Sequence, residues 1–376
     1  MTDTEQINES VEVPVVIGGY YRSGTTMFAN TLKHSTRNHH FIGVELQLRT
    51  FVLEYDKFCP KHNWLLIANL LEKQQQISVD KTSFIKLADF SKENTIDYIK
   101  QVPKNYRAGQ AVKWLFDKVA SENSKSSFTG KDNFAEIYYE RLQKKFGKFK
   151  LIILVRDPRS VISSNIYMGS FPNRNTDHLG SILRHLAGWI INVNTSIRLQ
   201  KKYPEYVKII KYEDLINNDK KVMNTISNIF NSKISKLDPS KMKYRFSTYK
   251  NSQKDKFYDN NNKFRENLSD DEIQIIEQIA AREMNYFSYN NIIKKGKNLF
   301  LYRILFNILR GICLISPPFS VFLSNIVFIK KYYLSWLRNK ITYYLVVTRI
   351  ISPNILRTEV LFNKGNPLGI IYKTYE

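Results

Sequence analysis

Apolar runs that end abruptly in polar residues recur along the chain and predict the strands of a parallel sheet. "VPVVIG" (residues 13–18) is rich in β-branched residues, "LIILV" covers residues 151–155, and "VKII" covers residues 207–210. Runs of this length, each followed by a helical pattern, are typical of buried strands in βα units. The pattern therefore predicts one main α/β domain with a central parallel sheet.

Two helices are indicated by the period of their apolar residues. Segment 262–289 contains a capping box, Ser269 with Glu272, and then an apolar stripe at Ile273, Ile276, Ala280 and Met284. Ahead of the 151–155 strand, apolar residues recur at every fourth position, at Phe134, Tyr138, Leu142 and Phe146. Both patterns predict helices with one buried face.

The turn after the first strand, "GYYRSGTT" (19–26), has the form of a phosphate-binding loop. It meets the pattern G-x-x-x-x-G-K-[ST], except that Thr25 occupies the lysine position. Backbone N–H groups at the helix start, with the hydroxyls of Ser23, Thr25 and Thr26 beside Gly24, would hold an anionic oxygen. Arg22 supplies the positive charge, and its guanidinium can bind two oxygens of a phosphate-like group. The alternative is a glycine turn between a core strand and a core helix.

A second candidate site follows the 151–155 strand. The strand ends in Arg156, Asp157 and Pro158, and the proline predicts a helix start. Carboxyl ends of parallel strands line the ligand crevice, so Arg156 is expected at the same edge as the loop. Ser164 lies eight residues later, about two helical turns on, where it could support the same anion. The alternative is that Arg156 and Asp157 form a surface pair.

Composition narrows the possible partners and surroundings. Lys and Arg number 57 against 34 Asp and Glu, a net charge of +23, which favours anionic nucleotides, acidic glycans or anionic membranes. The two cysteines, Cys59 and Cys313, belong to no motif, so neither a disulfide scaffold nor a zinc site is supported. The polar, acidic N-terminus lacks a signal segment, and we expect a cytoplasmic location.

The composition changes near residue 291. Eleven Lys or Arg and no Asp or Glu occur between residues 291 and 358. Gly311 to Ile329 carry no charge, but Pro317 and Pro318 argue against a simple spanning helix. Such segments are typical of the interface of anionic membranes, and the alternative is helices that pack on the main domain. We therefore predict a disordered N-terminus (1–12), a main domain (13–290) and a basic, apolar, helical C-terminal extension (291–376).

The two candidate sites together resemble a known enzyme family. "YYRSGTT" and "VRDPRSVISS" are similar to the two nucleotide-binding signatures of sulfotransferases that use 3′-phosphoadenosine 5′-phosphosulfate (PAPS). The similarity is closer to the carbohydrate and tyrosylprotein branch, which has an arginine in the loop. The resemblance implies a three-layer P-loop-like fold and PAPS as cosubstrate, without a metal. It assigns Arg22 to Thr26 to the 5′-phosphosulfate, and Arg156 and Ser164 to the 3′-phosphate.

Two weaker matches extend this resemblance over residues 13–290. "YEDL" places Tyr212 where the family has a tyrosine near the adenine, and Lys263 precedes the closing helix where a family lysine reaches the nucleotide. The alternatives are a core tyrosine and a solvated lysine.

The resemblance also suggests the catalytic groups. Glu45, twenty-three residues after Arg22, stands near the family position of the general base that accepts the acceptor proton. His39 and His40 are rival bases, although as surface histidines at a turn they would be bystanders. Lys131, twenty-five residues before Arg156, matches a family lysine that contacts the sulfonyl group, with Arg22 as a second catalytic cation.

The predicted function is transfer of a sulfonyl group from PAPS to a hydroxyl of a glycan, a glycolipid or a similar acceptor. A P-loop kinase is one alternative, although Thr25 and Arg156 count against it. The other alternative is a non-enzymatic basic protein on a P-loop scaffold that binds membranes or nucleic acid. The leading interpretation expects an anionic membrane as a possible partner of residues 291–358 and expects no nucleic acid.

Overall fold

The structure is a computed structural model that describes residues 12–33, 35–42, 46, 48, 52, 97–98, 101–103, 105–168, 178–238, 262–293, 358–361 and 371–374. The chain divides into two compact units. The first unit comprises Met1–Gly19, Gly24–Leu154 and Ser196–Phe257, and the second comprises Tyr20–Ser23, Val155–Thr195 and Tyr258–Glu376.

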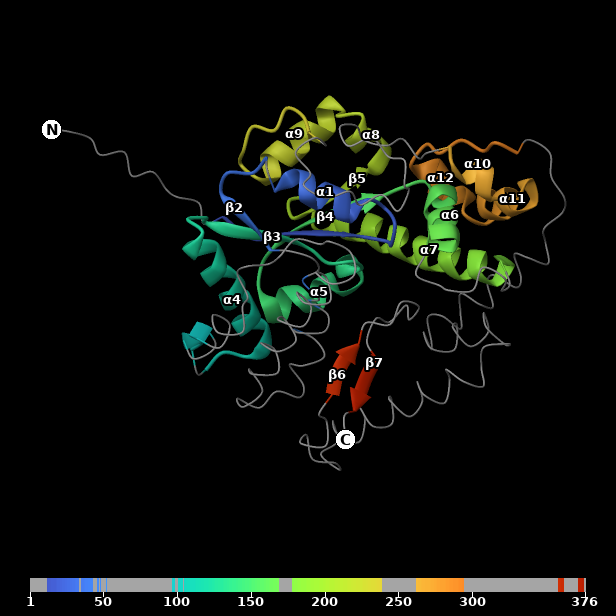
Figure 1. Cartoon of the computed structure of the whole chain (residues 1–376). Coiled ribbons are helices and arrows are strands. Elements are labelled where there is room, and N and C mark those ends of the chain that lie inside the picture. The colour runs from blue at the N-terminus through green and yellow to red at the C-terminus, as the bar shows by residue number, and fades with distance from the viewer. Residues whose placement is uncertain are drawn as a thin grey trace. The chain divides into compact units, whose positions relative to one another are not determined.

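A five-stranded sheet with the order β2-β3-β1-β4-β5 forms the centre of the first unit (Figure 1). β1 is parallel to both β3 and β4, and β2 is parallel to β3. The strands are β1 (Val15–Gly19), β2 (His39–Ile42), β3 (Ser127–Lys131), β4 (Lys150–Val155) and β5 (Val207–Lys211). The predicted parallel sheet is therefore confirmed, and each of the three predicted strands is present.

Helices cover both faces of this sheet, as the three-layer prediction requires (Figure 1). On one face, α1 (Thr25–Leu32) and α9 (Lys220–Ile229) share an apolar cluster with residues of β1, β4 and β5. On the other face, α4 (Ala108–Glu122) and α5 (Ala135–Phe146) pack through edge-to-face aromatic rings of Phe116, Phe128 and Phe146. α8 (Tyr212–Ile216) follows β5 directly.

From Pro158 to residue 293, the described residues of the second unit are mainly helical. Its helices include α6 (Pro158–Met168), most of α7 (His178–Lys202), α10 (Phe264–Asn267), α11 (Asp270–Ile279) and α12 (Ala281–Tyr286). The predicted capping box is present, because Ser269 Oγ accepts from Glu272 N while the Glu272 carboxylate accepts from Ser269 N. The predicted apolar stripe is buried. It is not on a single helix, because α11 ends at Ile279 and the last residue of the stripe, Met284, belongs to α12.

Beyond residue 293, the C-terminal extension is described only at residues 358–361 and 371–374. β6 (Thr358–Leu361) pairs antiparallel with β7 (Ile371–Thr374), so this part forms strands where a helix was expected. Residues 311–329 lie outside the described residues, and none of the helices in the described ranges has the length and hydrophobicity to cross a membrane.

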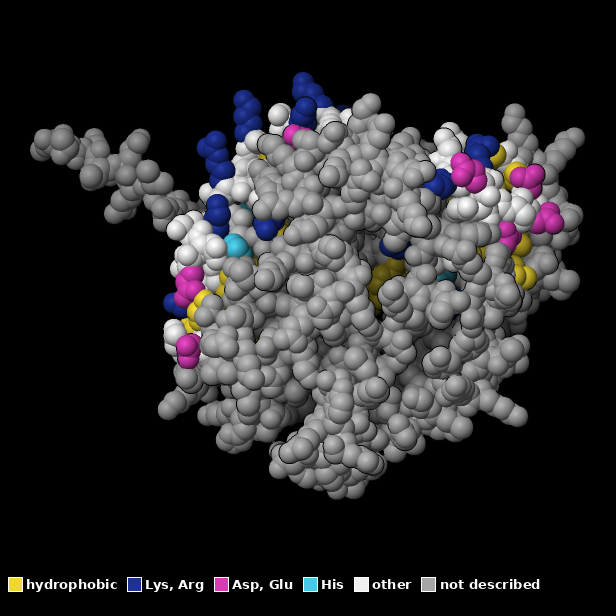
Figure 2. Space-filling model, in the orientation of Figure 1, with side chains coloured by type: hydrophobic (Ala, Val, Ile, Leu, Met, Phe, Trp, Pro, Cys, Tyr) yellow, Lys and Arg dark blue, Asp and Glu magenta, His cyan; other side chains and the backbone are white. Residues whose placement is uncertain are grey.

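Charged side chains of opposite sign gather over different helices. Figure 2 shows Lys and Arg side chains over α9, where Lys220 and Lys221 are exposed. It shows acidic side chains over α11, whose first turn contains Asp270, Asp271 and Glu272. The positive charge of the chain is therefore unevenly distributed even among the described residues.

Candidate functional site

The loop between β1 and α1 has an unusual backbone. Arg22 has a φ of 66° and Gly24 has a φ of 91°, both in the left-handed region. This conformation is uncommon for a residue with a side chain and is often found at functional sites. A Cβ atom at Gly24 would lie 2.4 Å from a ring carbon of Tyr212, so only glycine fits there.

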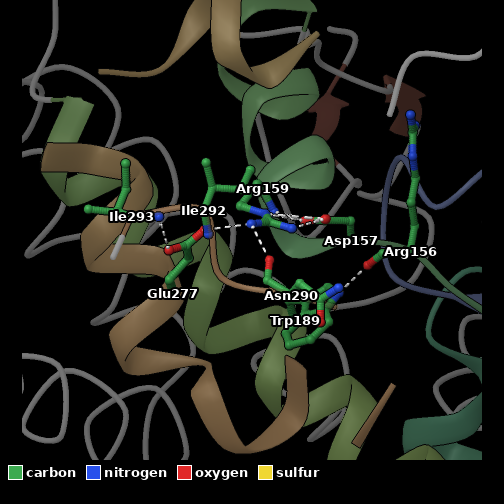
Figure 3. A network of polar contacts seen from close by, with 8 residues as sticks. All are labelled: Arg156, Asp157, Arg159, Trp189, Glu277, Asn290, Ile292 and Ile293. Carbon is green, nitrogen blue, oxygen red and sulfur yellow. Dashed lines mark hydrogen bonds and ion pairs between the residues drawn. The ribbon is translucent and has the colours of Figure 1, made fainter. Parts of the chain in front are cut away.

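Three residues predicted to bind phosphate come together in the second unit. Arg22 Nε donates a hydrogen bond to Ser164 Oγ at 2.9 Å, and Arg156 Nη1 donates to the Arg22 carbonyl at 3.3 Å. Trp189 Nε1 in turn donates to the Arg156 carbonyl at 3.0 Å (Figure 3). The loop arginine and both residues of the second signature thus form one cluster, as the sequence predicted.

The chemistry of this cluster fits an anionic group. The cluster contains two guanidinium groups, and guanidinium donors match the oxygens of phosphate and sulfate. The Ser23 hydroxyl is buried, and no hydrogen-bond partner for it is found among the described residues. A buried hydroxyl is rarely left unsatisfied, so Ser23 is a candidate donor to a bound ligand or water.

The second residue of the loop is anchored on α7 in the same unit. Tyr20 Oη lies 3.1 Å from His185 Nδ1, and a Cβ atom at Gly188 would lie 2.7 Å from the Tyr20 ring. Burial lowers the pKa of His185 well below its usual range, so the ring is neutral. This contact was not predicted from the sequence, because nothing in the spacing of residues marks His185.

Lys131 lies at the end of β3 in the first unit and is buried. Two residues later, Asn133 Oδ1 accepts a hydrogen bond from Thr25 Oγ1 at 3.2 Å, at the start of α1. The predicted lysine segment is therefore bonded to the residue that replaces the lysine of an ATP-binding loop. Thr26, the last residue of the loop, lies in the first turn of α1.

The proposed general base, Glu45, lies outside the described residues, as does Glu54, the next carboxylate along the chain and a further candidate base. Their neighbours in the sequence are informative. Leu46 N donates to the Lys131 carbonyl at 2.7 Å, and Leu48 N donates to Asp132 Oδ2 at 2.8 Å. The residue that follows Glu45 is therefore bonded to the predicted catalytic lysine.

The two rival histidines belong to β2, so the prediction that they lie at a surface turn is wrong. His39 is buried, with Nδ1 3.1 Å from the Phe128 carbonyl and 3.0 Å from Thr129 Oγ1. Burial lowers the pKa of His39. The pattern "HHFI" did not look like a strand because its first two residues are polar, and the neighbouring β3 provides polar partners for His39.

Tyr212 and Lys263 are placed at helix starts. The Tyr212 ring is buried and packs on Gly24, so the tyrosine contacts the loop that the resemblance assigns to the nucleotide. Lys263 precedes α10 and is half-buried.

Glu136, in the first turn of α5, was not predicted from the sequence. Its Oε2 accepts a hydrogen bond from Gly19 N at 3.1 Å, where β1 passes into the loop. Burial raises the pKa of the carboxyl group to about 8. The predicted stripe included Phe134 and Tyr138, whereas the structure buries Ala135, Glu136 and Tyr139 instead. This shift of one residue explains why Glu136 was not recognised.

The alternative of a surface pair between Arg156 and Asp157 is also wrong. Asp157 is buried, and its carboxylate pairs with Arg159 at 2.6 Å (Figure 3). Arg159 pairs in addition with Glu277 of α11. Within the described ranges, no group of three or more His, Cys, Asp or Glu side chains is arranged to hold a metal ion.

Comparison with known proteins supports an enzyme that transfers a sulfonyl group. Residues 14–234 match the model of the Sulfotransferase family, which favours this activity over the kinase and non-enzymatic alternatives. No match was found among curated proteins.

Several solved structures are similar to this chain. The sulfotransferase domain of the olefin synthase from Synechococcus PCC 7002 is 19% identical, with a TM-score of 0.48, over 74% of this chain and 98% of that domain. A sulfotransferase from Mycobacterium avium is 14% identical, with a TM-score of 0.41, over 76% of this chain and 79% of that one. A retinol dehydratase in complex with retinol and PAP is 12% identical, with a TM-score of 0.32, over 76% of this chain and 84% of that one.

Proposed function

This chain belongs to the sulfotransferase family, and we propose that it transfers a sulfonyl group from PAPS to a hydroxyl of a glycan, a glycolipid or a similar acceptor. The observation that carries the proposal is the cluster of Arg22, Arg156 and Ser164. Its donors suit a phosphate group, and PAPS differs from ATP in having a 3′-phosphate. We assign Arg156 and Ser164 to that phosphate.

The loop is the proposed site of the 5′-phosphosulfate. The buried Ser23 hydroxyl, the Arg22 guanidinium and the start of α1 at Thr25 all supply donors suited to a sulfate or phosphate oxygen. The Tyr212 ring, which packs on Gly24, supports a contact with the adenine. The sequence match at Lys263 supports a contact with the nucleotide. The absence of a loop lysine agrees with a substrate that needs no magnesium bridge.

In the proposed reaction, PAPS supplies the sulfonyl group. The oxygen of the acceptor hydroxyl forms a bond to sulfur, the bond between sulfur and the 5′-phosphate oxygen breaks, and adenosine 3′,5′-bisphosphate (PAP) leaves. Lys131 and Arg22 would stabilise the negative charge on the sulfonyl and leaving oxygens. Glu45 would accept the hydroxyl proton, which raises the nucleophilicity of the acceptor oxygen.

The contacts around Lys131 support this pairing of base and cation. Lys131 O accepts from Leu46 N, so the backbone next to Glu45 is tied to the end of β3. Asp132 Oδ2 accepts from Leu48 N two residues later. Two hydrogen bonds, from Leu46 and from Leu48, fix the position of this segment better than one bond does, and catalysis depends on such positioning.

The surroundings of the enzyme are a second part of the proposal. We place the enzyme in the cytoplasm. We place residues 291–358 at an anionic membrane surface, because that segment contains eleven Lys or Arg and no Asp or Glu. An acceptor with a lipid anchor would suit this location.

Two measurements test the proposed function. PAP should raise the thermal midpoint of the protein, and ATP with magnesium should raise it far less. At a PAP concentration of a hundred times the dissociation constant, binding adds about 2.7 kcal/mol to the free energy of unfolding. Equal shifts would contradict the PAPS assignment. The protein should also add a sulfonyl group, seen by mass spectrometry, to a glycan or glycolipid in host extracts supplied with PAPS. Transfer only to other hydroxyl compounds would correct the acceptor class alone.

A further inference from the structure

Three charged side chains are buried together at the start of α6. Asp157, Arg159 and Glu277 are 7%, 4% and 2% exposed. Arg159 Nη2 lies 2.6 Å from Asp157 Oδ2, and its Nη1 lies 2.5 Å from Glu277 Oε1 (Figure 3). The guanidinium also lies over the Phe264 ring, 4.9 Å from its centroid. Arg159 therefore joins α6 to α11 and to the first residue of α10.

Glu277 also holds the chain that follows α12. Its Oε1 accepts from Ile292 N at 2.9 Å, and its Oε2 accepts from Ile293 N at 3.2 Å. Arg159 Nη1 donates to the Asn290 carbonyl at 2.9 Å. Figure 3 shows these backbone groups converging on the Arg159–Glu277 pair. The charge of Glu277 is thus met by a guanidinium and two N–H groups, as a buried carboxylate requires.

The same network determines how α6 begins. Asp157 Oδ1 accepts from Arg159 N at 2.8 Å, and the Asp157 carbonyl accepts from Val161 N at 3.0 Å. Asp157 therefore caps the helix that starts at Pro158. It directly follows Arg156, so its orientation also sets the direction of the peptide that carries Arg156.

A second contact holds α6 one turn further along. Asn267 Nδ2, at the end of α10, donates to Ser163 Oγ at 3.0 Å. Ser163 precedes Ser164, whose hydroxyl accepts from Arg22. α10 and α11 therefore hold α6 at its start and again beside Ser164.

We propose that Arg159, Glu277 and Asn267 form a clamp that positions Arg156 and Ser164 to recognise a 3′-phosphate. The inference rests on the proposed function, which assigns that phosphate to Arg156 and Ser164. The clamp residues are positioning residues, because they act on these two through α6 and its cap. A loosened clamp would weaken recognition of the 3′-phosphate more than it weakens recognition of the rest of the nucleotide.

The test compares the binding of PAP and AMP, which differ only in the 3′-phosphate, by isothermal titration calorimetry of the full-length protein. Glu277→Gln keeps the size of the side chain and removes the charge that pairs with Arg159. We expect the preference for PAP over AMP to fall about tenfold, and the affinity for AMP to change by less than about twofold, because the lost discrimination corresponds to one charge-assisted hydrogen bond. An unchanged preference overturns the clamp.

Glu283→Gln is the matched control. Glu283 is a buried acid in the same unit, and its Oε1 accepts from Asn194 Nδ2 of α7 at 2.8 Å rather than from a group of α6. This variant should keep the wild-type preference for PAP. If it loses the preference as much as Glu277→Gln does, the effect is a general loosening of the unit, and the clamp is overturned.

Asn267→Ala provides a second test that does not leave a buried charge without its partner. It removes the contact with Ser163, and we expect the preference for PAP to fall about threefold, the size of one neutral hydrogen bond. If Glu277→Gln does not fold, an unchanged preference in Asn267→Ala overturns the clamp. Equal binding of PAP and AMP by the wild-type protein would instead overturn the proposed function, so the two failures are distinguishable.

Discussion

The two units stabilise comparably buried carboxyl groups in different ways. Glu136 in the first unit is 1% exposed and accepts from Gly19 N, and burial raises its pKa to about 8. Glu277 in the second unit is 2% exposed and is the partner of the Arg159 guanidinium. Burial alone therefore does not determine what a carboxyl group does, because its neighbours decide whether it keeps a proton or forms an ion pair.

The two units also carry different residues of the proposed reaction. The first unit contains Lys131 and the segment next to Glu45, which we assign to the chemistry of transfer. The second unit contains the cluster of Arg22, Arg156 and Ser164, of which we assign the last two to binding of the 3′-phosphate. Variants that separate turnover from nucleotide affinity test this division directly.

The largest effect is expected for Glu45→Gln. General-base catalysis is typically worth about 10² to 10⁴ in rate, and this variant keeps the shape of the side chain while removing its basicity. Turnover should fall by that order, while the affinity for PAP should stay close to that of the wild type. Turnover by sulfonyl transfer and PAP binding by calorimetry check both parts.

Glu54→Gln serves as the control for Glu45→Gln, because Glu54 is the next carboxylate along the chain. Normal turnover in Glu45→Gln, together with a slow Glu54→Gln enzyme, would transfer the role of base to Glu54. If both variants turn over normally, His40 is the remaining candidate, because His39 is enclosed by its contacts in β2 and β3.

Arg22→Ala should have the next largest effect, about 10² to 10³ in turnover, by analogy with the loss of one oxyanion donor. Arg22 would lose its contact with the phosphosulfate and its bond to Ser164. Arg156→Ala should differ by weakening PAP binding first, with a smaller change in turnover at saturating PAPS. Arg198→Ala, an exposed residue of α7, is the control and should behave as the wild type. Identical kinetic profiles for Arg22→Ala and Arg156→Ala would contradict the division of roles.

Glu136 predicts a pH dependence of stability. Its pKa in the folded protein, about 8, lies above the ordinary value of 4.5, so the folded state holds a proton that the unfolded state releases. The stabilisation is complete below about pH 4.5 and is lost as the pH rises toward 8, by about 3 kcal/mol at pH 7. Glu136→Gln keeps an acceptor for Gly19 N and cannot ionise, so it should remove this loss.

Urea unfolding between about pH 5 and pH 8 measures the effect. Glu140→Gln, on the same helix, is the control, because Lys202 and Tyr203 lower the pKa of Glu140 and its titration falls below this range. The wild-type protein and Glu140→Gln should lose stability in parallel as the pH rises, and Glu136→Gln should not. Parallel slopes for all three proteins would show that Glu136 is ionised throughout.

The sequence predicted the parts of the fold that an apolar run makes visible. β1, β4 and β5 were recognised because their residues are buried and apolar, and the capping box marked the start of α11. β2 and β3 were missed because His39, Ser127, Thr129 and Lys131 interrupt the apolar pattern. Partners from a distant part of the chain satisfy some of these polar groups, such as Thr129 Oγ1 beside His39, and no local pattern reveals them.

The candidate site shows the same limit. Arg22, Arg156 and Ser164 were predicted together because two motifs carry them, and the structure brings them into contact. Glu136 and Glu277 belong to no motif, and their roles depend on Gly19 and Arg159, which lie 117 and 118 residues away in the chain. The proposed ligand contacts are therefore visible in the sequence, whereas the groups proposed to position them are not.

The smallest effect is expected from truncation, which tests where the second unit ends. A chain that ends at Ile293 keeps the bonds of Asn290 O, Ile292 N and Ile293 N to the Arg159–Glu277 pair. A chain that ends at Tyr289 loses all three and leaves Glu277 with fewer donors, which should reduce stability by about 1–3 kcal/mol. Thermal or urea unfolding of the two proteins measures the difference, and equal stabilities would show that residues 290–293 contribute nothing.

Both truncated proteins lack the basic segment, so neither should pellet with anionic vesicles at low salt, whereas the full-length chain should. If the chain that ends at Ile293 pellets as the full-length chain does, the exposed lysines of α9 become the better candidate for membrane attraction.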